Sequence, residues 1–250
     1  MLIDTHAHLN FKEFNKDRYQ VIKRAFEGGV EKIINVGTNL KDSKDSILFA
    51  EKYKNISATI GLHPIDVQNE KFDEEVWLKL AKHQKVVAIG ETGFDFFHPA
   101  DKEKQKEIFK ALIKIACQVK KPLILHSREA DKEILDILSH SKLPPQRGVI
   151  HCFGRDYTLA KKFLELGFLI SYTGNITYNK ERTSSISKVP LNKIMVETDC
   201  PFMTPVPFRG KRNEPVFVKY IAEEIAKIKN LSYEEITNTT TANARKLFRI

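Results

Sequence analysis

The sequence lacks long hydrophobic runs. Charged residues interrupt each apolar stretch well short of the ~20 residues that a membrane-spanning helix requires, so we expect no membrane partner. Residues 1–6 carry neither a basic segment nor an apolar segment of the secretory type, which predicts that no signal peptide is present. Cysteine is also scarce, and the three in the chain are Cys117, Cys152 and Cys200. This number is too small for a disulfide framework and is typical of the reducing cytoplasm.

No low-complexity tract or linker divides the chain. Its 250 residues are 42% hydrophobic, which excludes a disordered protein and suffices for one sizeable core. We therefore expect residues 1–250 to form a single domain, at about the length of a (β/α)8 barrel. Nothing in the sequence indicates an obligate protein partner.

The net charge of +9 has two interpretations. A basic surface attracts polyanions such as nucleic acids. Much of the excess, however, consists of lysines spread along amphipathic segments, such as Lys79, Lys82 and Lys85, which is also the pattern of an ordinary solvated surface. The charge alone therefore does not define the function.

Short apolar runs alternate with segments of helical periodicity along the whole chain. Apolar residues at helical spacing, such as Ile108, Leu112 and Ile115, predict helices, and a helical pair is predicted over residues 216–228 and 233–248. The alternation predicts an α/β fold, a closed (β/α)8 TIM barrel, with a doubly wound open sheet as the alternative. Eight runs predict strands buried on both faces: 2–8, 32–36, 57–60, 86–89, 122–125, 148–150, 167–171 and 193–196.

Polar side chains gather at the carboxyl ends of these predicted strands. In a parallel barrel the ends converge on one rim, where active sites are built from the loops. Five of the eight histidines lie at such ends, with two carboxylates beside them. The residues are His6, His8, His63, Glu91, His126, His151 and Asp199.

These residue types are the ones that hold divalent metal ions. Because side chains alternate along a strand, His6 and His8 point to the same side, although such a pair alone can also be two hydrogen-bonded core residues. Two carboxylates packed at one rim without cations would be costly, so Glu91 and Asp199 favour a metal site. Six ligands exceed the needs of one tetrahedral ion and suit two divalent cations bridged by Glu91.

The identity of the cations stays open at this point, because imidazole and carboxylate ligands together suit Zn, Mn, Ni or Fe, and Mg is also possible. Either Asp4 or Glu197 is a candidate partner for an imidazole N–H group.

The motifs that carry these residues resemble those of the TatD family of metal-dependent hydrolases and deoxyribonucleases, in the amidohydrolase-like superfamily. The match runs in order over essentially the whole chain, with Phe94 in place of the family's leucine. The motifs are Asp-Thr-His-Ala-His (4–8), Gly-Leu-His-Pro (61–64), Gly-Glu-Thr-Gly-Phe-Asp (90–95), Leu-His-Ser-Arg (125–128), His-Cys-Phe-Gly (151–154), Glu-Thr-Asp-Cys-Pro (197–201) and Arg-Gly-Lys-Arg-Asn-Glu-Pro (209–215).

The resemblance implies a TIM barrel and a two-metal deoxyribonuclease that cuts DNA phosphodiester bonds, as a 3′-5′ exonuclease on single strands. We expect a water held between the two ions to attack phosphorus, with Glu91 and Asp199 as catalytic residues and Asp199 taking the proton. The family's motifs imply the same metal ligands as the strand ends: His6, His8, Glu91, His126, His151 and Asp199.

Two other functions stay open. Some relatives deacylate D-aminoacyl-tRNA, so the same site in an ester or amide hydrolase with tRNA as partner is the first alternative. The second is a non-catalytic nucleic-acid-binding module that uses the positive charge, although a pure binder needs no water-activating ligand set.

Residues that contact substrate are predicted less sharply. Arg128 follows a predicted ligand by two positions, within reach of a phosphate. The two arginines of segment 209–215 either bind phosphate or tie their loop down through Glu214. His63 contacts substrate, acts as an acid, or makes a structural hydrogen bond. The phenylalanines fall mostly at core spacing, so no base-stacking platform is evident. The predicted substrate-binding residues are His63, Arg128, Arg209 and Arg212.

Overall fold

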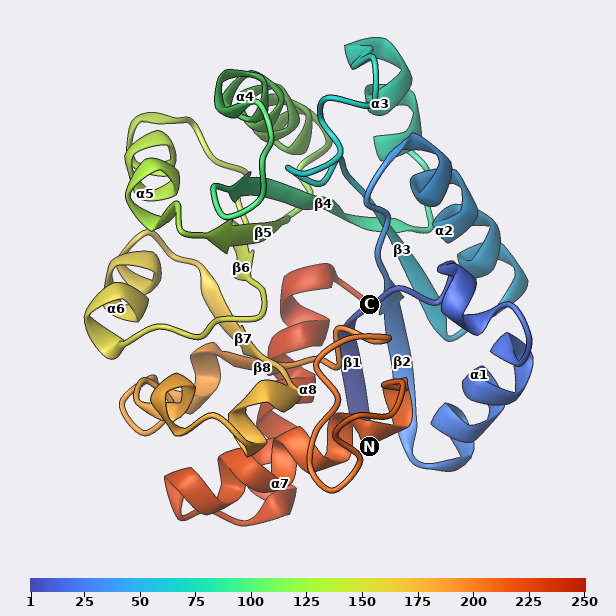
Figure 1. The fold of residues 1–250 in the computed structure, drawn as a ribbon, viewed down its shortest axis with the longest axis vertical. Coiled ribbons are helices and arrows are strands. Elements are labelled where there is room, and N and C mark those ends of the chain that lie inside the picture. The colour runs from blue at the N-terminus through green and yellow to red at the C-terminus, as the bar shows by residue number, and fades with distance from the viewer.

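A computed structural model describes residues 1–250, with every side chain except that of Arg182. Eight parallel strands form one sheet in chain order (Figure 1). Its ends meet through a bridge between Ala7 and Cys200, and the backbone N–H of His8 donates to the Cys200 carbonyl at 2.9 Å. This nearly closed barrel confirms the predicted fold over the open sheet. The strands are β1 (Leu2–Ala7), β2 (Val30–Asn35), β3 (Ile56–Ile60), β4 (Val86–Asp95), β5 (Leu123–Arg128), β6 (Gly148–Ile150), β7 (Leu169–Tyr172) and β8 (Ile194–Val196).

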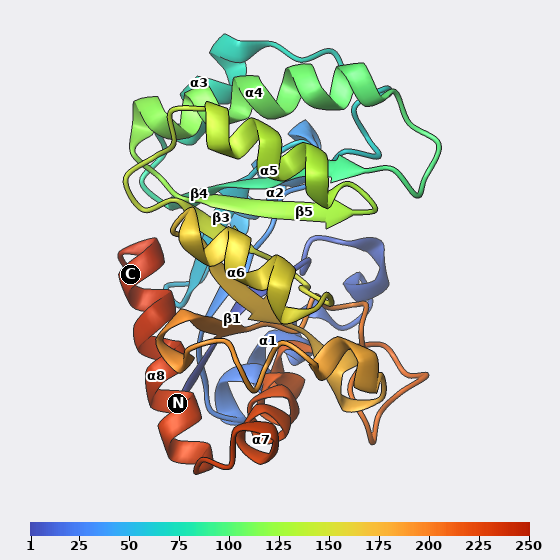
Figure 2. The same cartoon turned by 90° about the vertical axis from the view of Figure 1, so that its left-hand side faces the viewer.

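Helices surround the barrel (Figures 1 and 2). Those at the C-terminal end confirm the predicted helical pair. Several helices begin at a side chain that caps the first turn, such as Asp101 before α4 and Ser232 before α8, as short polar residues at these positions favour. The helices are α1 (Arg18–Glu27), α2 (Leu40–Lys52), α3 (Glu74–Ala81), α4 (Lys102–Val119), α5 (Asp131–His140), α6 (Tyr157–Glu165), α7 (Val218–Lys229) and α8 (Tyr233–Phe248).

The alternation of strand and helix fails once in the described backbone. Between β7 and β8 the chain forms three short 3-10 helices in place of an α-helix, because this mostly polar segment has no apolar face at helical spacing. The 3-10 helices of the chain are η1 (Lys12–Phe14), η2 (Gly174–Thr177), η3 (Lys180–Thr183), η4 (Leu191–Lys193) and η5 (Pro215–Phe217).

The barrel interior is apolar at one end. A single cluster joins buried side chains of β2, β5 and β8, such as Ile34, Ile124 and Met195, with Leu247 and Phe248 of α8. Helix α8 therefore covers the end where the strands begin, and the opposite end, toward which the strands point, is left to the loops (Figure 2). Among the described residues, no helix is both long enough and apolar enough to cross a membrane.

Candidate metal centre

The six predicted ligands converge at the carboxyl ends of the strands. His6 lies on β1 with His8 just after it, Glu91 lies on β4 and His126 on β5. The remaining two, His151 and Asp199, follow β6 and β8. The side chains are largely buried at the mouth of the barrel.

Glu91 lies in the middle of the cluster and divides it into two groups. Its Oε2 atom is 3.3 Å from His6 Nε2 and 3.8 Å from His8 Nε2. The other oxygen, Oε1, is 2.8 Å from His151 Nε2 and 2.9 Å from His126 Nδ1. Each oxygen of one carboxylate therefore faces a separate pair of imidazoles.

Asp199 completes the first group. Its Oδ1 atom lies 3.4 Å from His8 Nε2 and 3.7 Å from His6 Nε2. The residue has a left-handed backbone with φ of 55°, and its N–H donates to the His6 carbonyl at 2.8 Å. Because this bond ties the segment after β8 to β1, the Asp199 carboxylate stays beside the two histidines of the first strand.

Hydrogen bonds outside the cluster orient the rings. Nδ1 of His8 lies 3.2 Å from the Val36 carbonyl, which can only accept, so the N–H is at Nδ1 and the lone pair of Nε2 faces the cluster. In the same way Nε2 of His126 donates to Asp95, across 3.3 Å, and leaves Nδ1 as the inner acceptor. Asp95 is not among the site residues that the sequence predicts, although it shares strand parity with Glu91 on β4.

The two carboxylates proposed as imidazole partners differ in the structure. Oε1 of Glu197 lies 3.3 Å from His151 Nδ1 and accepts the backbone N–H of Cys152 at 2.7 Å. Asp4 instead accepts the hydroxyl of Thr198 at 2.6 Å and the backbone N–H of Thr198 at 2.8 Å. Burial raises the pKa of Asp4 to about 8. Glu197 is therefore the one placed against a ring of the cluster.

The charges of the cluster stabilise its carboxylates. Burial alone would raise the pKa of Glu91, but the imidazoles of His151, His63 and His126 hold it well below its usual range. Burial would likewise lower the pKa of His151, yet the nearby carboxylates of Glu91 and Glu197 raise it well above the ordinary value. The negative charge of Glu91 and a proton on His151 therefore stabilise each other in the metal-free protein.

The donor set fits divalent cations. With their outer hydrogen bonds made, His8 and His126 turn lone pairs inward, and the carboxylates, when ionised, contribute only acceptors. His6 Nε2 lies 3.1 Å from His8 Nε2, and His126 Nδ1 lies 3.2 Å from His151 Nε2. Acceptors brought this close together and buried require protons or metal ions between them. Imidazole nitrogen with carboxylate oxygen is the ligand set of Zn, Mn, Fe or Ni.

His63 also faces this cluster. Its Nδ1 accepts the backbone N–H of Ile65 at 3.3 Å, so the neutral ring carries its proton on Nε2. That atom lies 3.4 Å from Glu91 Oε1 and 3.3 Å from His126 Nδ1. Burial lowers the pKa of His63, which keeps the ring neutral. Its Nε2–H is therefore a donor aimed into the site.

The predicted arginines have different locations. Arg128 lines the cavity above the cluster and places its guanidinium carbon 3.9 Å from the centre of the Phe97 ring. The guanidinium of Arg209 instead lies 4.3 Å from the ring centre of Tyr178, outside that cavity as the described residues define it. Of the two, only Arg128 is brought to the predicted metal ligands.

Arg212 also lies outside the cavity, as the described side chains define it. Its two terminal nitrogens bond both oxygens of Asp17, each at 2.7 Å, and Nη2 lies 3.1 Å from Glu214 Oε1. The structure thus places Arg212 in the loop-tying role that we kept as the alternative to phosphate binding. The partner that the sequence did not indicate is Asp17, at the start of α1.

The cavity over the cluster has a volume of about 650 Å³, within the range of ligand pockets. Besides the cluster itself, its walls include Phe11, Phe97, Phe202 and the cationic side chains of Arg128 and Arg155. Arg155 pairs with Asp131 at 3.1 Å. A buried set of imidazoles and carboxylates, open to such a cavity at the rim of a (β/α)8 barrel, is the architecture of a metal-dependent hydrolase.

Comparison with known proteins agrees with this class. A family model described as TatD related DNase matches residues 3–249. The chain is 41% identical to YabD of Bacillus subtilis (strain 168), an uncharacterized metal-dependent hydrolase, over 100% of both chains. It is 37% identical to the uncharacterized metal-dependent hydrolase YcfH of Escherichia coli (strain K12), over 100% of this chain and 96% of YcfH.

A solved structure extends the likeness to three dimensions. The crystal structure of YJJV, a TatD homolog from Escherichia coli K12, superposes with a TM-score of 0.91 at 31% identity, over 100% of this chain and 98% of YJJV. The protein therefore belongs to the TatD family of metal-dependent hydrolases, as its sequence motifs led us to expect.

Proposed function

We propose that this protein is a deoxyribonuclease that hydrolyses phosphodiester bonds of single-stranded DNA from the 3′ end, with two divalent cations. The observation that carries the proposal is the position of Glu91, whose two oxygens face two separate pairs of imidazoles. Such a carboxylate suits a bridge between two ions. The family description, TatD related DNase, supports DNA as the substrate. The residues that hold the ions are His6, His8, Glu91, His126, His151 and Asp199.

Divalent cations in a centre of this kind supply Lewis-acid chemistry, which makes water a stronger acid and neutralises charge on phosphoryl oxygens. Asp199 accepts the proton of the attacking water. Burial favours the neutral form of this residue, but in the metal-free protein the neighbouring imidazoles of His8, His6 and His151, when protonated, hold its pKa below the usual value. It also lines the cavity, where substrate must lie.

Two other side chains bind and orient the phosphodiester. The Nε2–H of His63 donates to a phosphoryl oxygen or to the leaving oxygen, because its partner on the other ring nitrogen fixes the proton on this atom. The Arg128 guanidinium is exposed on the cavity wall and can contact a phosphate with two parallel hydrogen bonds. We therefore propose a substrate-contact role for both residues.

The experiment is a side-by-side assay of three substrates with metal-reconstituted protein. End-labelled single-stranded DNA, the same strand in a duplex, and D-aminoacyl-tRNA are incubated with equal amounts of enzyme. We expect a ladder of shortened single strands, with the label at the 5′ end retained, and slower loss of the duplex. Deacylation of the tRNA with intact DNA would instead establish the ester hydrolase, and binding of DNA without any cleavage would establish a non-catalytic module.

The number of ions is tested separately. Metal content after dialysis is expected to approach two equivalents for the wild-type protein. Glu91→Gln removes the bridging charge and is expected to lose both ions, whereas a variant of one group, such as His126→Ala, is expected to retain one. One equivalent in the wild type would contradict the two-metal centre while leaving the hydrolase class intact.

A further inference from the structure

Two phenylalanines at the mouth of the cavity are exposed in a way that packing does not explain. Phe97 is 54% exposed and Phe202 is 50% exposed, and both line the cavity above the metal ligands. Phe97 follows β4 and Phe202 follows β8, and in a ring of eight strands in chain order these two strands lie opposite one another. Half-exposed aromatic rings therefore lie on two facing sides of the site.

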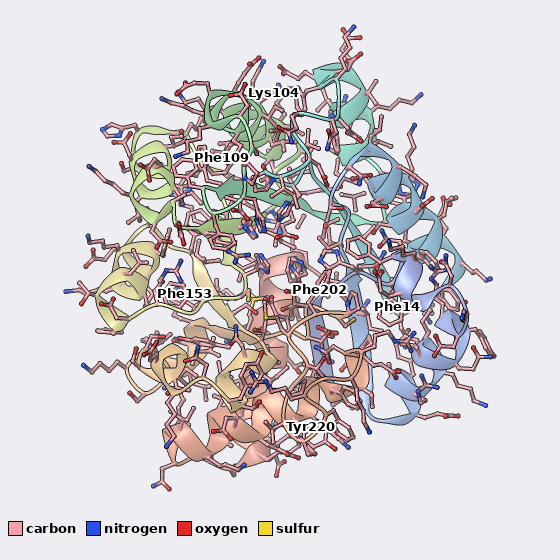
Figure 3. All side chains as sticks on the ribbon, in the orientation of Figure 1. Phe14, Lys104, Phe109, Phe153, Phe202 and Tyr220 are labelled. Atoms are coloured by element: carbon pink, nitrogen blue, oxygen red, sulfur yellow. The ribbon has the colours of Figure 1, made fainter. Side chains whose placement is uncertain are left out.

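Phe202 is held in place close to the metal centre. Its ring lies edge-on to Phe11, with centroids 6.2 Å apart, and Phe11 is stacked on the ring of His8 at 4.6 Å. The backbone N–H of Phe202 donates to the Asp199 carbonyl at 2.9 Å, and its own carbonyl accepts the side-chain amide of Asn213 at 2.6 Å. Figure 3 shows Phe202 at the central opening of the barrel. An aromatic wall thus adjoins the ligands of the first group.

The opposite side combines an aromatic ring with a cation. The guanidinium of Arg128 covers the Phe97 ring, and the backbone N–H of Phe97 donates to Asp95 at 3.0 Å. A flat guanidinium on a flat ring keeps its hydrogen-bond donors at the edge, where a phosphate can reach them. On the side of Phe202, the described residues of the cavity wall include Phe11 and Met203, and a second hollow that shares Phe11 and Phe202 is lined by Lys12 and Lys41.

We propose that Phe202 is a stacking platform for the nucleobase next to the scissile phosphate, and that Phe97 with Arg128 receives the following nucleotide on the facing side. This inference rests on the proposed function. Stacking on an aromatic face requires an unpaired base, because a duplex buries the faces of its bases. The platform therefore selects single-stranded DNA, and since every base has a flat face, it does so with little preference for sequence.

The binding experiment uses the metal-loaded Asp199→Asn protein, which holds the strand without cutting it. Fluorescence anisotropy compares a labelled single strand with the same strand carrying abasic sites at its 3′ end. We expect Phe202→Ala to weaken binding of the normal strand about tenfold, and Phe202→Trp to restore it. The abasic strand is expected to bind the parent protein at least as weakly as the normal strand binds Phe202→Ala, and its affinity is expected to be the same for the parent and for Phe202→Ala.

The matched control is Tyr19→Ala, because Tyr19 is an aromatic residue of α1 that is 63% exposed and lies away from the cavity wall as the described residues define it. It is expected to bind the strand as the parent protein does. The stacking role of Phe202 would be overturned if Phe202→Ala bound the normal strand as tightly as the parent does, or if the parent bound the abasic strand tightly. Thermal unfolding of each variant shows whether the fold is kept, and Phe97→Ala provides a second test on the facing side, with a smaller loss expected.

The two proposals fail in different ways. If the wild-type protein cuts no DNA, the nuclease proposal is lost, while the anisotropy comparison still measures whether bases stack on Phe202. If it cuts normal and abasic strands with the same kcat/KM, the nuclease stands and the platform is refuted. If Phe202→Ala lowers kcat/KM for the normal strand but not for the abasic strand, the result supports both the nuclease and the stacking platform.

Discussion

The buried carboxylate of Asp95 accepts a hydrogen bond from Nε2 of His126 across 3.3 Å. It also accepts the ring N–H of His98 at 2.8 Å and the backbone N–H of Phe97 at 3.0 Å. Burial would raise the pKa of Asp95, but the hydrogen bonds from His126 and His98 hold it below its usual range, so it is ionised. Asp95 thereby fixes which nitrogen of His126 faces Glu91, and acts as a positioning residue.

Asp95→Asn is expected to weaken metal binding. The substitution keeps the size of the side chain but removes the charge that holds Nε2–H of His126, so the ring is free to turn or to change tautomer. We expect the affinity for Co²⁺ to fall about 10- to 100-fold in competition with a chelator, and the visible spectrum of the bound ion to change. Asp136→Asn, at a largely exposed carboxylate of α5, is the control. Wild-type affinity in Asp95→Asn would rule out the positioning role.

Metal affinity is expected to fall on acidification, starting above the pH at which free histidine titrates. In the metal-free protein, burial would lower the pKa values of His8, His126 and His151, but the neighbouring carboxylates raise all three. Protons therefore compete with cations for these nitrogens at pH values above the ordinary range of histidine, and more strongly as the pH falls through that range. Titration with Co²⁺ at a series of pH values measures this loss of metal affinity, and protons are expected to be released when the ion binds. A Co²⁺ affinity that does not change with pH would contradict the competition between protons and cations.

The ligand positions followed from strand parity and strand ends because these are local properties of the chain. His6 and His8 are two residues apart on one strand, and any parallel barrel brings the ends of β4, β5 and β6 to the same rim. The prediction of the ligand positions required only that the carboxyl ends of the strands converge on one rim, and the structure shows that they do.

Contacts between distant segments could not be derived in this way. The pairing of Arg212 with Asp17 joins residues 195 positions apart, and nothing near either residue indicates the other. Asp95 contacts His126 only because the ring of His126 has one particular orientation. The exposure of Phe202 depends on how the loop after β8 folds back to Asn213, whereas its residue type suggested ordinary core packing.

The ion pair of Arg212 with Asp17 is expected to stabilise the loop after β8. Both oxygens of Asp17 bond the guanidinium, and the side chains are partly buried. A double-mutant cycle with Arg212→Ala and Asp17→Ala is expected to give a coupling of about 1 kcal/mol in the free energy of unfolding. The exposed pair of Lys41 with Asp45 is the control, with a smaller coupling. A coupling no larger than that control would contradict this tethering role.

The same pair sets a pH dependence. The hydrogen bond from Arg212 lowers the pKa of Asp17 from the model-compound value of 3.8. A carboxyl group whose pKa is lowered on folding stabilises the protein above its unfolded pKa, and loses this contribution as the pH falls through the folded value. The difference in stability between the wild type and Arg212→Ala is therefore expected to shrink below about pH 4, in denaturant titrations at fixed salt.

Asp199→Asn tests the proton acceptor of the proposed reaction. Asp199 has φ of 55°, a left-handed conformation that asparagine also adopts readily, so the substitution leaves the backbone unstrained. The amide has nearly the same shape as the carboxylate but cannot take a proton from water. We expect kcat on single-stranded DNA to fall about 10²- to 10⁴-fold, with binding of the strand changed little.

Because Asp199 is also a proposed ligand, the metal content of the variant must be measured with the rate. With excess metal present and both ions bound, a loss of turnover reports on proton transfer. If the ions are bound and kcat stays near the wild-type value, another group accepts the proton, and the nearest carboxylate in the cluster is Glu91, which then requires the same test. A variant that loses both turnover and one ion, and recovers both as metal is raised, would show that Asp199 acts as a ligand and not as the base.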